Sequence, residues 1–293
     1  MKRKVIQLST KTLVISLPLD WAEKNKVIKG SEVEVIEKDD RLLITTQPTE
    51  SLKIILNLTD KTVFDKRYIG DLYIRGYDEI KIKFQNPTIL EEIRKIDLLG
   101  YDIVETGKDY CIIKNVASAL EAEFDTMLRK CFMLTKQMFS SLVDHFEGND
   151  VNLKEVRKLE AENNKISVFC LRILNKHGYK ESHKTTFLYV IAREIEAICD
   201  ILKYIIDDLA EGAKVNDKTK KYFKEVSNFY TAYYELFYKY DKDKFKEFYN
   251  KRKELIRDGR KMDGIGRHAL NLVVAIYNIT GPGLTMNIEN IYK

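Results

Sequence analysis

The sequence predicts a multidomain, mainly α-helical protein of 293 residues. A small β-rich unit and an α+β insert come first, and two three-helix bundles in tandem follow. Three observations predict this order. Residues 3–46 alternate apolar and polar side chains over short stretches, which is typical of strands. Residues 51–114 mix strand-like and helix-like patterns, and after residue 116 apolar residues recur three and four apart in six successive stretches.

The β-rich unit covers residues 1–48. In chain order we expect strands at 5–7 and 12–17, a helix at 18–26 that begins at Pro18, a turn at Gly30, and strands at 33–36 and 42–45 around a turn at 39–41. Proline is tolerated in a first helical turn, and glycine accepts a positive φ. A unit of about 50 residues rarely holds a core alone, so we expect it to form a homodimer or a higher homo-oligomer.

The segments Leu13–Pro18, Trp21–Ala22 and Ile28–Val33 resemble the AbrB/SpoVT swapped-hairpin domain, in particular the version fused to PhoU repeats in archaea. The resemblance covers residues 3–46 and implies a dimer that binds DNA. The chain departs from the family where Ser31 replaces an aspartate and where Ser9–Thr10 replaces a glycine.

A basic edge, defined as Lys2, Arg3, Lys4 and Lys11, precedes the first acidic residue, Asp20. The net charge of +5 is too small to argue for nucleic acid by itself. The edge is either an ordinary solvated charge run or a set of phosphate contacts on DNA. The AbrB resemblance favours the second interpretation, because family members grip DNA with basic side chains in this region.

The insert, residues 51–114, follows a linker at 47–50. In chain order we expect a strand at 52–58, a helix at 59–73, a strand at 80–84, a helix from Pro87 to Leu99 that Gly100 caps, and strands at 101–105 and 110–114. This order predicts an α+β fold, for which a ferredoxin-like arrangement is our expectation. Its role is not indicated by any motif.

Six helices follow, grouped as residues 116–212 and 213–293. We expect them at 116–146, 152–177, 184–211, 217–240, 242–258 and 261–280, with Gly281-Pro282-Gly283 ending the last. The third has an unbroken apolar seam from Leu188 to Leu209. Asn163 interrupts the seam of the second helix and needs a polar partner if it is buried.

A charged stripe runs beside the seam of the third helix and consists of Arg193, Glu196, Asp200, Lys203 and Asp207. Glu196 and Asp200 are four residues apart, so both carboxylates lie on one helix face. The stripe is either a solvated ladder of ion pairs, each worth about 0.3 kcal/mol, or it includes a carboxylate pair that binds a metal ion.

Ala192–Asp200 resembles the third-helix signature of the PhoU family of phosphate-signalling proteins, with Ala197 and Cys199 at the family's Arg and Gly positions. That family has two three-helix bundles in tandem, and its Glu-x-x-x-Asp pairs hold multinuclear metal clusters. The resemblance implies one site for a divalent metal or iron at Glu160, Glu196 and Asp200. The family's second acid on the 152–177 helix is replaced by Asn164.

A second metal site is not expected. Ile265–Asn271 resembles the corresponding family motif, but Arg267 replaces its aspartate, whose partner is Asp263. A guanidinium repels a cation and cannot ligate it. His268 has no nucleophile at a matching spacing, so we expect it to pack in the bundle or to flank its surface.

Enzyme activity is not expected, because no nucleophile elbow, phosphate-binding loop or dinucleotide fingerprint is present. The four cysteines, at 111, 131, 170 and 199, lack metal-site spacing, so we expect buried free thiols. The N-terminus lacks a signal-peptide core, and no run of about 18 apolar residues occurs. We therefore expect a cytoplasmic protein without membrane insertion.

These features give two functional hypotheses. The first is a phosphate-response regulator that binds DNA through its N-terminal dimer and relays a signal through PhoU-like bundles. The alternative is a PhoU-like adaptor that docks on a phosphate transporter ATPase, a kinase or another signalling protein without binding DNA.

Overall fold

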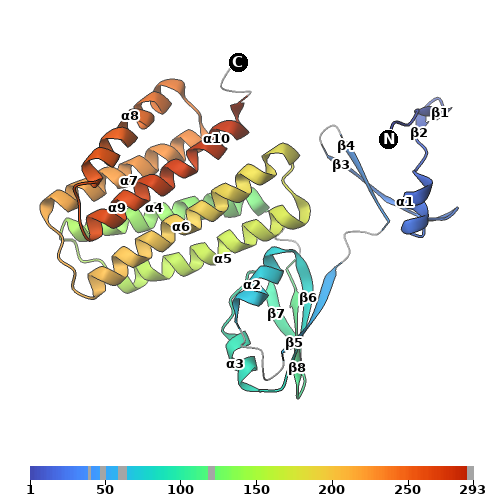
Figure 1. Cartoon of the computed structure of the whole chain (residues 1–293), viewed down its shortest axis with the longest axis horizontal. Helices are drawn as coiled ribbons and strands as arrows, with labels where there is room; N and C mark the ends of the chain where they lie inside the picture. The colour runs from blue at the N-terminus through green and yellow to red at the C-terminus, as the bar shows by residue number, and fades with distance from the viewer. Residues whose placement is uncertain (39–40, 47–50, 59–64, 118–122, 289–293) are drawn as a thin grey trace. The chain divides into compact units, whose positions relative to one another are not determined.

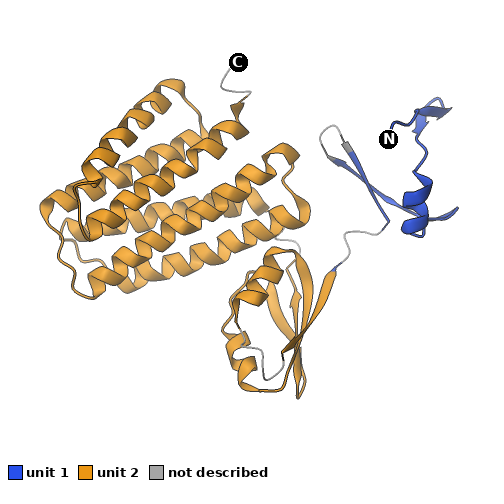
Figure 2. Ribbon diagram, viewed as in Figure 1, with its two compact units in different colours: residues 1–51 blue, residues 52–293 orange. Residues whose placement is uncertain are grey.

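The structure, a computed structural model, describes residues 1–38, 41–46, 51–58, 65–117 and 123–288. Residues 1–51 and 52–293 form two separate units (Figure 2). The expected mainly helical protein with a strand-containing N-terminal region is confirmed for the described residues (Figure 1). The predicted linker at 47–50 and most of the predicted turn at 39–41 lie outside them.

The N-terminal unit has no buried side chain among its described residues. Its elements are β1 (Ile6–Ser9), β2 (Thr12–Val14), α1 (Leu19–Lys24), β3 (Glu34–Lys38) and β4 (Arg41–Thr45). β1 pairs with β2 and β3 with β4, both antiparallel, as two separate hairpins. Isolated two-stranded hairpins are marginally stable in water. Gly30 has the expected positive φ, at 89°.

The insert is a four-stranded sheet with two helices. Its elements are β5 (Leu52–Leu58), α2 (Arg67–Ile74), β6 (Tyr77–Phe84), α3 (Thr88–Arg94), β7 (Tyr101–Thr106) and β8 (Tyr110–Asn115). The strand order is β5-β6-β8-β7, with β5 parallel to β6 and the other pairs antiparallel. A ferredoxin-like fold has the chain order βαββαβ. The ferredoxin-like expectation is therefore wrong, because the second helix of this insert precedes both strands of the β7–β8 hairpin.

In the described part of residues 123–288, the second unit has seven α-helices and one short 3-10 helix, Ser182–Lys184. The α-helices are α4 (Phe124–Phe146), α5 (Leu153–His177), α6 (Thr185–Ala210), α7 (Asp217–Tyr238), α8 (Lys242–Gly259), α9 (Ile265–Asn278) and α10 (Thr280–Met286). Figure 1 shows α4, α5 and α6 side by side, with α7, α8 and α9 packed next to them. The predicted helices at 152–177 and 184–211 agree with α5 and α6 within one residue at each end.

The two helix triplets share one buried core rather than two. Aromatic residues spaced seven apart join α4 to α7: Phe132 lies 4.9 Å from Phe237, Phe139 lies 5.0 Å from Tyr230 and Phe146 lies 5.2 Å from Phe223, measured between ring centroids. Aromatic pairs contribute about 0.5–1.5 kcal/mol each beyond the burial of their area. This seam makes α4–α9 one packed body.

The sixth helix was expected to end at about residue 280, and α9 ends at Asn278, within two residues; a further short helix, α10, was not expected at Gly281-Pro282-Gly283. These residues lie inside α10, with Pro282 in its first turn, where a backbone N–H lacks an intrahelical partner and proline costs nothing. Among the described residues, Ile265–Met286 is the one stretch long and apolar enough to cross a membrane. A buried core helix passes the same test of length and composition, so this stretch is weak evidence for a membrane span. In the structure α9 contributes Ala269, Leu272 and Ile276 to the shared core, each fully buried.

A buried polar network connects α4 and α5. Asn163 is fully buried, and its Nδ2 donates to the Cys131 carbonyl at 2.8 Å and to Thr135 Oγ1 at 3.2 Å. Its Oδ1 accepts from Ser167 Oγ at 3.0 Å. The polar partner predicted for Asn163 is thus confirmed. The four cysteines are buried and free, as expected, and burial raises the pKa of the Cys111 thiol to about 11.

Arg172 of α5 attaches the insert to the helices. Its side chain is 1% exposed. Nη1 donates to the carbonyls of Tyr73 at 3.0 Å and Tyr77 at 2.7 Å, and Nη2 donates to Asp78 Oδ1. Cζ also lies 5.0 Å and 5.3 Å from the ring centroids of Tyr73 and Tyr101. The insert and the helices are therefore joined by a buried and well-satisfied charge.

Candidate functional site

The acids singled out in the sequence converge between α5 and α6. Glu160, on α5, is 7% exposed, whereas Glu196 and Asp200 lie one turn apart on α6 and are partly buried. Burial raises the pKa of Glu196, and the negative charges of Asp200 and Glu160 raise it further. The apolar seam of α6 faces the core, so the adjoining stripe comes to the edge of the α5–α6 contact.

Two cations of the protein lie among these acids. Lys203 Nζ lies 3.3 Å from Glu160 Oε1 and hydrogen-bonds Asp200 Oδ1. Arg157 Nη1 donates to Glu160 Oε2 at 2.8 Å, and its Nε donates to Asp207 Oδ1 at 3.0 Å. The charged stripe is therefore a network that joins two helices, not a ladder along one.

Burial and neighbouring charge shift two groups in this cluster. Burial, and then the charge of Asp200, raises the pKa of Glu196, against the opposing effect of Arg193 at 3.8 Å. Burial alone lowers the pKa of Lys203, but the hydrogen bond to Asp200 and the charge of Glu160 outweigh it, so that pKa is raised. Lys203 is thus held as an ammonium, while ionised Glu196 has only the longer ion pair with Arg193.

We expect Glu196→Gln to stabilise the protein at neutral pH. A carboxyl whose folded pKa is raised contributes stability below its unfolded pKa and loses that contribution as the pH rises through the folded value. The amide removes the cost of the buried charge, so its advantage over the wild type shrinks as the solution is acidified. Urea unfolding from pH 4 to pH 8 tests this. The control is Glu194→Gln, because Glu194 lies on α6 but is not one helical turn from Glu196 or Asp200. A loss of stability at pH 7 would contradict it.

The donor set does not fit a metal ion. Both carboxylate oxygens of Glu160 accept from cations of the protein, and an ammonium occupies the space between Glu160 and Asp200. Asn164, one turn after Glu160 on α5, offers an amide and not a carboxylate. Among the described residues, no group of three or more His, Cys, Asp and Glu is arranged to hold a metal.

The residues at which no second metal site was expected lie on α9 and just before it. Arg267 and Asp263 are exposed. His268 is partly buried, and its Nε2 lies 3.4 Å from Asp208 Oδ2 of α6. This contact joins α6 to α9.

The basic edge of the N-terminal unit is exposed throughout. Lys2, Arg3 and Lys4 precede β1 instead of lying on a strand. Lys11 lies in the β1–β2 turn, where its backbone N–H donates to Ser9 Oγ at 3.4 Å. None of the four has an ion-pair partner among the described residues.

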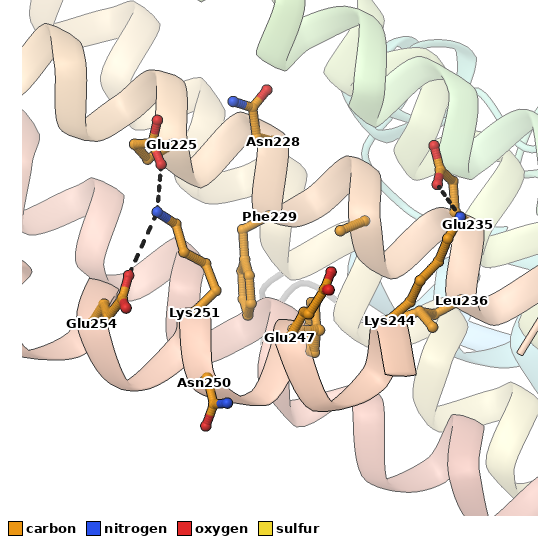
Figure 3. A pocket seen from close by; sticks show the side chains of 12 residues that line it. Glu225, Asn228, Phe229, Glu235, Leu236, Lys244, Glu247, Asn250, Lys251 and Glu254 are labelled. Carbon is orange, nitrogen blue, oxygen red and sulfur yellow. Dashed lines mark ion pairs between the residues drawn. The ribbon is translucent and has the colours of Figure 1, made fainter. Parts of the chain in front are cut away.

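A cavity of about 600 Å³ lies between α7 and α8. Figure 3 shows Phe229 between two lysine–glutamate groups. Lys251 Nζ lies 2.5 Å from Glu225 and 3.7 Å from Glu254, and Lys244 Nζ lies 3.7 Å from Glu235. The Phe229 and Phe248 rings stack across the two helices with centroids 4.1 Å apart. The cavity therefore has an apolar floor and a charged rim.

Two residues central to these sites were missed in the sequence. Arg157 lies one helical turn before Glu160, a spacing that could have indicated their pairing. Arg172 stands within the run Phe169–Leu174, where its charge could have indicated a buried partner. No local pattern indicates Asp78, which is 94 residues away.

Comparison of the chain with family models, curated proteins and solved structures gave no match. The functional argument therefore rests on the residues themselves.

Proposed function

We propose that this protein is a phosphate-response regulator that binds DNA as a homodimer through residues 1–48 and relays a signal through its helices. The observation that carries the homodimer is the exposed apolar surface of the N-terminal unit. Leu8, Leu13 and Ile28 are each at least 70% exposed, and no described side chain of the unit is buried. A second copy of the unit would cover this apolar surface.

Charge is divided between the two hairpins of the unit, which supports a DNA-binding face on the first. The basic edge belongs to the β1–β2 hairpin and its N-terminal extension, which contain no acid. Exposed Glu32, Glu34 and Glu37 belong to the β3–β4 hairpin. The first hairpin therefore carries its positive charge without opposing acids and is the better suited to neutralise phosphates, and in a dimer its lysines and arginine are doubled. Lysine and arginine suit phosphate contacts, so specificity would come from DNA shape and half-site spacing.

The phosphate-response part is supported by the resemblance of Ala192–Asp200 to the PhoU signature and by the arrangement of α4–α9 in two triplets. The shared core of these triplets supports a relay that acts as one body. The insert, which Arg172 attaches to α5, lies next in the chain after the N-terminal unit.

We expect Arg3→Ala/Lys11→Ala to weaken binding to all DNA sequences alike. Each lost phosphate contact reduces the slope of log affinity against log salt by about 0.9, so a dimer that lacks both side chains twice loses about 3.6. Fluorescence anisotropy with a labelled genomic duplex across a salt series measures both quantities.

The matched control for this measurement is Lys24→Ala/Lys29→Ala, which removes the same charge from exposed positions outside the basic edge. Light scattering verifies that both variants keep the wild-type oligomeric state. Equal affinity and equal slope for the wild type and Arg3→Ala/Lys11→Ala would show that the basic edge does not bind DNA.

The cavity between α7 and α8 favours the second candidate function, an adaptor that docks on a transporter ATPase or kinase. Protein partners commonly lay an amphipathic helix into an apolar groove with a charged rim. If the full-length protein binds no duplex at low salt, the adaptor function replaces the regulator.

A further inference from the structure

A second cavity of the helices lies where the end of α7 meets the second turn of α4, and its volume is about 570 Å³. Arg129 of α4, Tyr234 and Tyr238 of α7, and Lys239, which follows α7, belong to its lining. Ligand sites for small molecules commonly measure about 300–1,000 Å³. The functions proposed for the protein do not use this cavity.

Two tyrosines one helical turn apart form the aromatic wall of the cavity. The rings of Tyr234 and Tyr238 meet edge to face with centroids 5.1 Å apart, and Tyr238 is 46% exposed. Both rings pack against buried Phe132 of α4, at centroid distances of 5.8 Å and 5.9 Å. Rings that the core holds on one side and solvent reaches on the other suit the stacking of a planar ligand.

Two cations in the lining have no carboxylate partner. Arg129 is exposed, and its Cζ lies 5.6 Å from the centroid of the Tyr238 ring. Lys239 is the next residue after Tyr238 and is also exposed. Neither cation forms an ion pair with a residue that the structure describes. A guanidinium presents paired N–H donors that match a phosphate group, and an ammonium binds phosphate as a point charge.

The two acids in the lining already have partners. Asp241 is the N-cap of α8, and its Oδ1 accepts from the backbone N–H groups of Asp243 and Lys244 at 3.0 Å and 2.9 Å. Glu235 Oε2 lies 3.7 Å from Lys244 Nζ. The lining thus has three cations against two acids, and both acids are engaged. The charge available to a ligand is positive, which favours an anion.

We propose that this cavity binds a nucleoside phosphate, with its base on the two tyrosines and its phosphates at Arg129 and Lys239. A nucleotide combines a planar π system with a polyanion in one molecule of suitable size. Inorganic phosphate would leave the tyrosines unused, and an apolar ligand would leave the two cations unused. The site lies on the helices and is independent of DNA binding, which depends on residues 1–48.

The experiment titrates ATP into the full-length protein by isothermal titration calorimetry. The buffer contains EDTA, so that only cations of the protein meet the phosphates. We expect ATP and GTP to bind alike, because stacking on tyrosine tolerates every base. Adenosine and inorganic tripolyphosphate, which each lack one half of the ligand, should bind at least about tenfold more weakly. Binding of a single-stranded oligoadenylate without binding of ATP would overturn the proposal.

Variants locate the ligand within the cavity. Arg129→Gln and Lys239→Gln change exposed side chains that the fold does not need, and each should weaken ATP binding about tenfold. Tyr238→Leu should weaken it by a similar factor through the lost stacking. The matched controls are Arg267→Gln, at an exposed position of α9, and Tyr204→Leu, at a position of α6 that is 50% exposed. Both controls should bind ATP as the wild type does.

Thermal unfolding gives a second readout, because a ligand of the folded state raises the Tm. ATP should raise the Tm of the wild type and of both controls, and much less that of Arg129→Gln and Lys239→Gln. Arg3→Ala/Lys11→Ala should bind ATP normally, which separates this site from DNA binding. The proposal fails if the wild type binds no ATP, or if Arg129→Gln and Lys239→Gln both bind it as tightly as the wild type.

Discussion

Asp78→Asn lowers the free energy of unfolding of the second unit by about 3–5 kcal/mol, the usual cost of removing one partner from a buried ion pair. The substitution keeps the shape of the side chain and removes only its charge. Arg172 and Lys176 would then lose the charged oxygen that both contact, although their side chains are only 1% and 9% exposed. Urea unfolding followed by circular dichroism measures the change.

Asp97→Asn is the matched control for this substitution. Asp97 pairs with Lys165 across the same boundary between the insert and α5, but it is 74% exposed. A surface pair of this kind contributes less than about 1 kcal/mol. The double variant Asp78→Asn/Arg172→Met should recover part of the loss, because it removes one of the two buried cations that Asp78 contacts. Equal effects of Asp78→Asn and Asp97→Asn would contradict a buried charge at this junction.

Asn163→Ala has the second large effect, a loss of about 2–4 kcal/mol from unsatisfied buried groups and a new cavity. The truncation leaves the Cys131 carbonyl, Thr135 Oγ1 and Ser167 Oγ without the amide that they contact. These groups belong to α4 and α5, in the interior of the shared core. The midpoint of urea unfolding should therefore fall sharply.

Asn164→Ala provides the control, since Asn164 is the next residue on α5 and is exposed. It changes the same chemical group at a position where water replaces any lost contact, so its effect should stay within about 0.5 kcal/mol. A comparable loss in both variants would mean that alanine acts through the helix itself and not through the network around Asn163.

The helices were predictable because each buries one face, and one face leaves a three-and-four repeat in the sequence. The seam of α6 from Leu188 to Ile205 is buried as that repeat requires. Asn163 could be recognised as a buried amide for the same reason, since it interrupts a seam. Local pattern also located the strands of the insert to within a few residues.

Partners that are distant in the sequence were not predictable. The pairing of β5 with β6 in parallel depends on a crossover, and strand periodicity carries no information about strand order. Lys203 could be placed on the charged stripe, but its position between Glu160 and Asp200 depends on how α5 is rotated against α6. The helix α10 was not predicted because proline ends most helices yet fits the first turn of a new one.

The Asp78 carboxylate of β6 accepts hydrogen bonds from both the first residue of β5 and α5. The backbone N–H of Leu52, the first residue of the second unit, donates to Asp78 Oδ2 at 3.2 Å. The other oxygen of that carboxylate accepts from Arg172 and Lys176 of α5. A displacement of α5 along the sheet must either carry the start of β5 with it or break this carboxylate's bonds. One carboxylate thus joins the first strand of the second unit, the neighbouring strand β6 and α5.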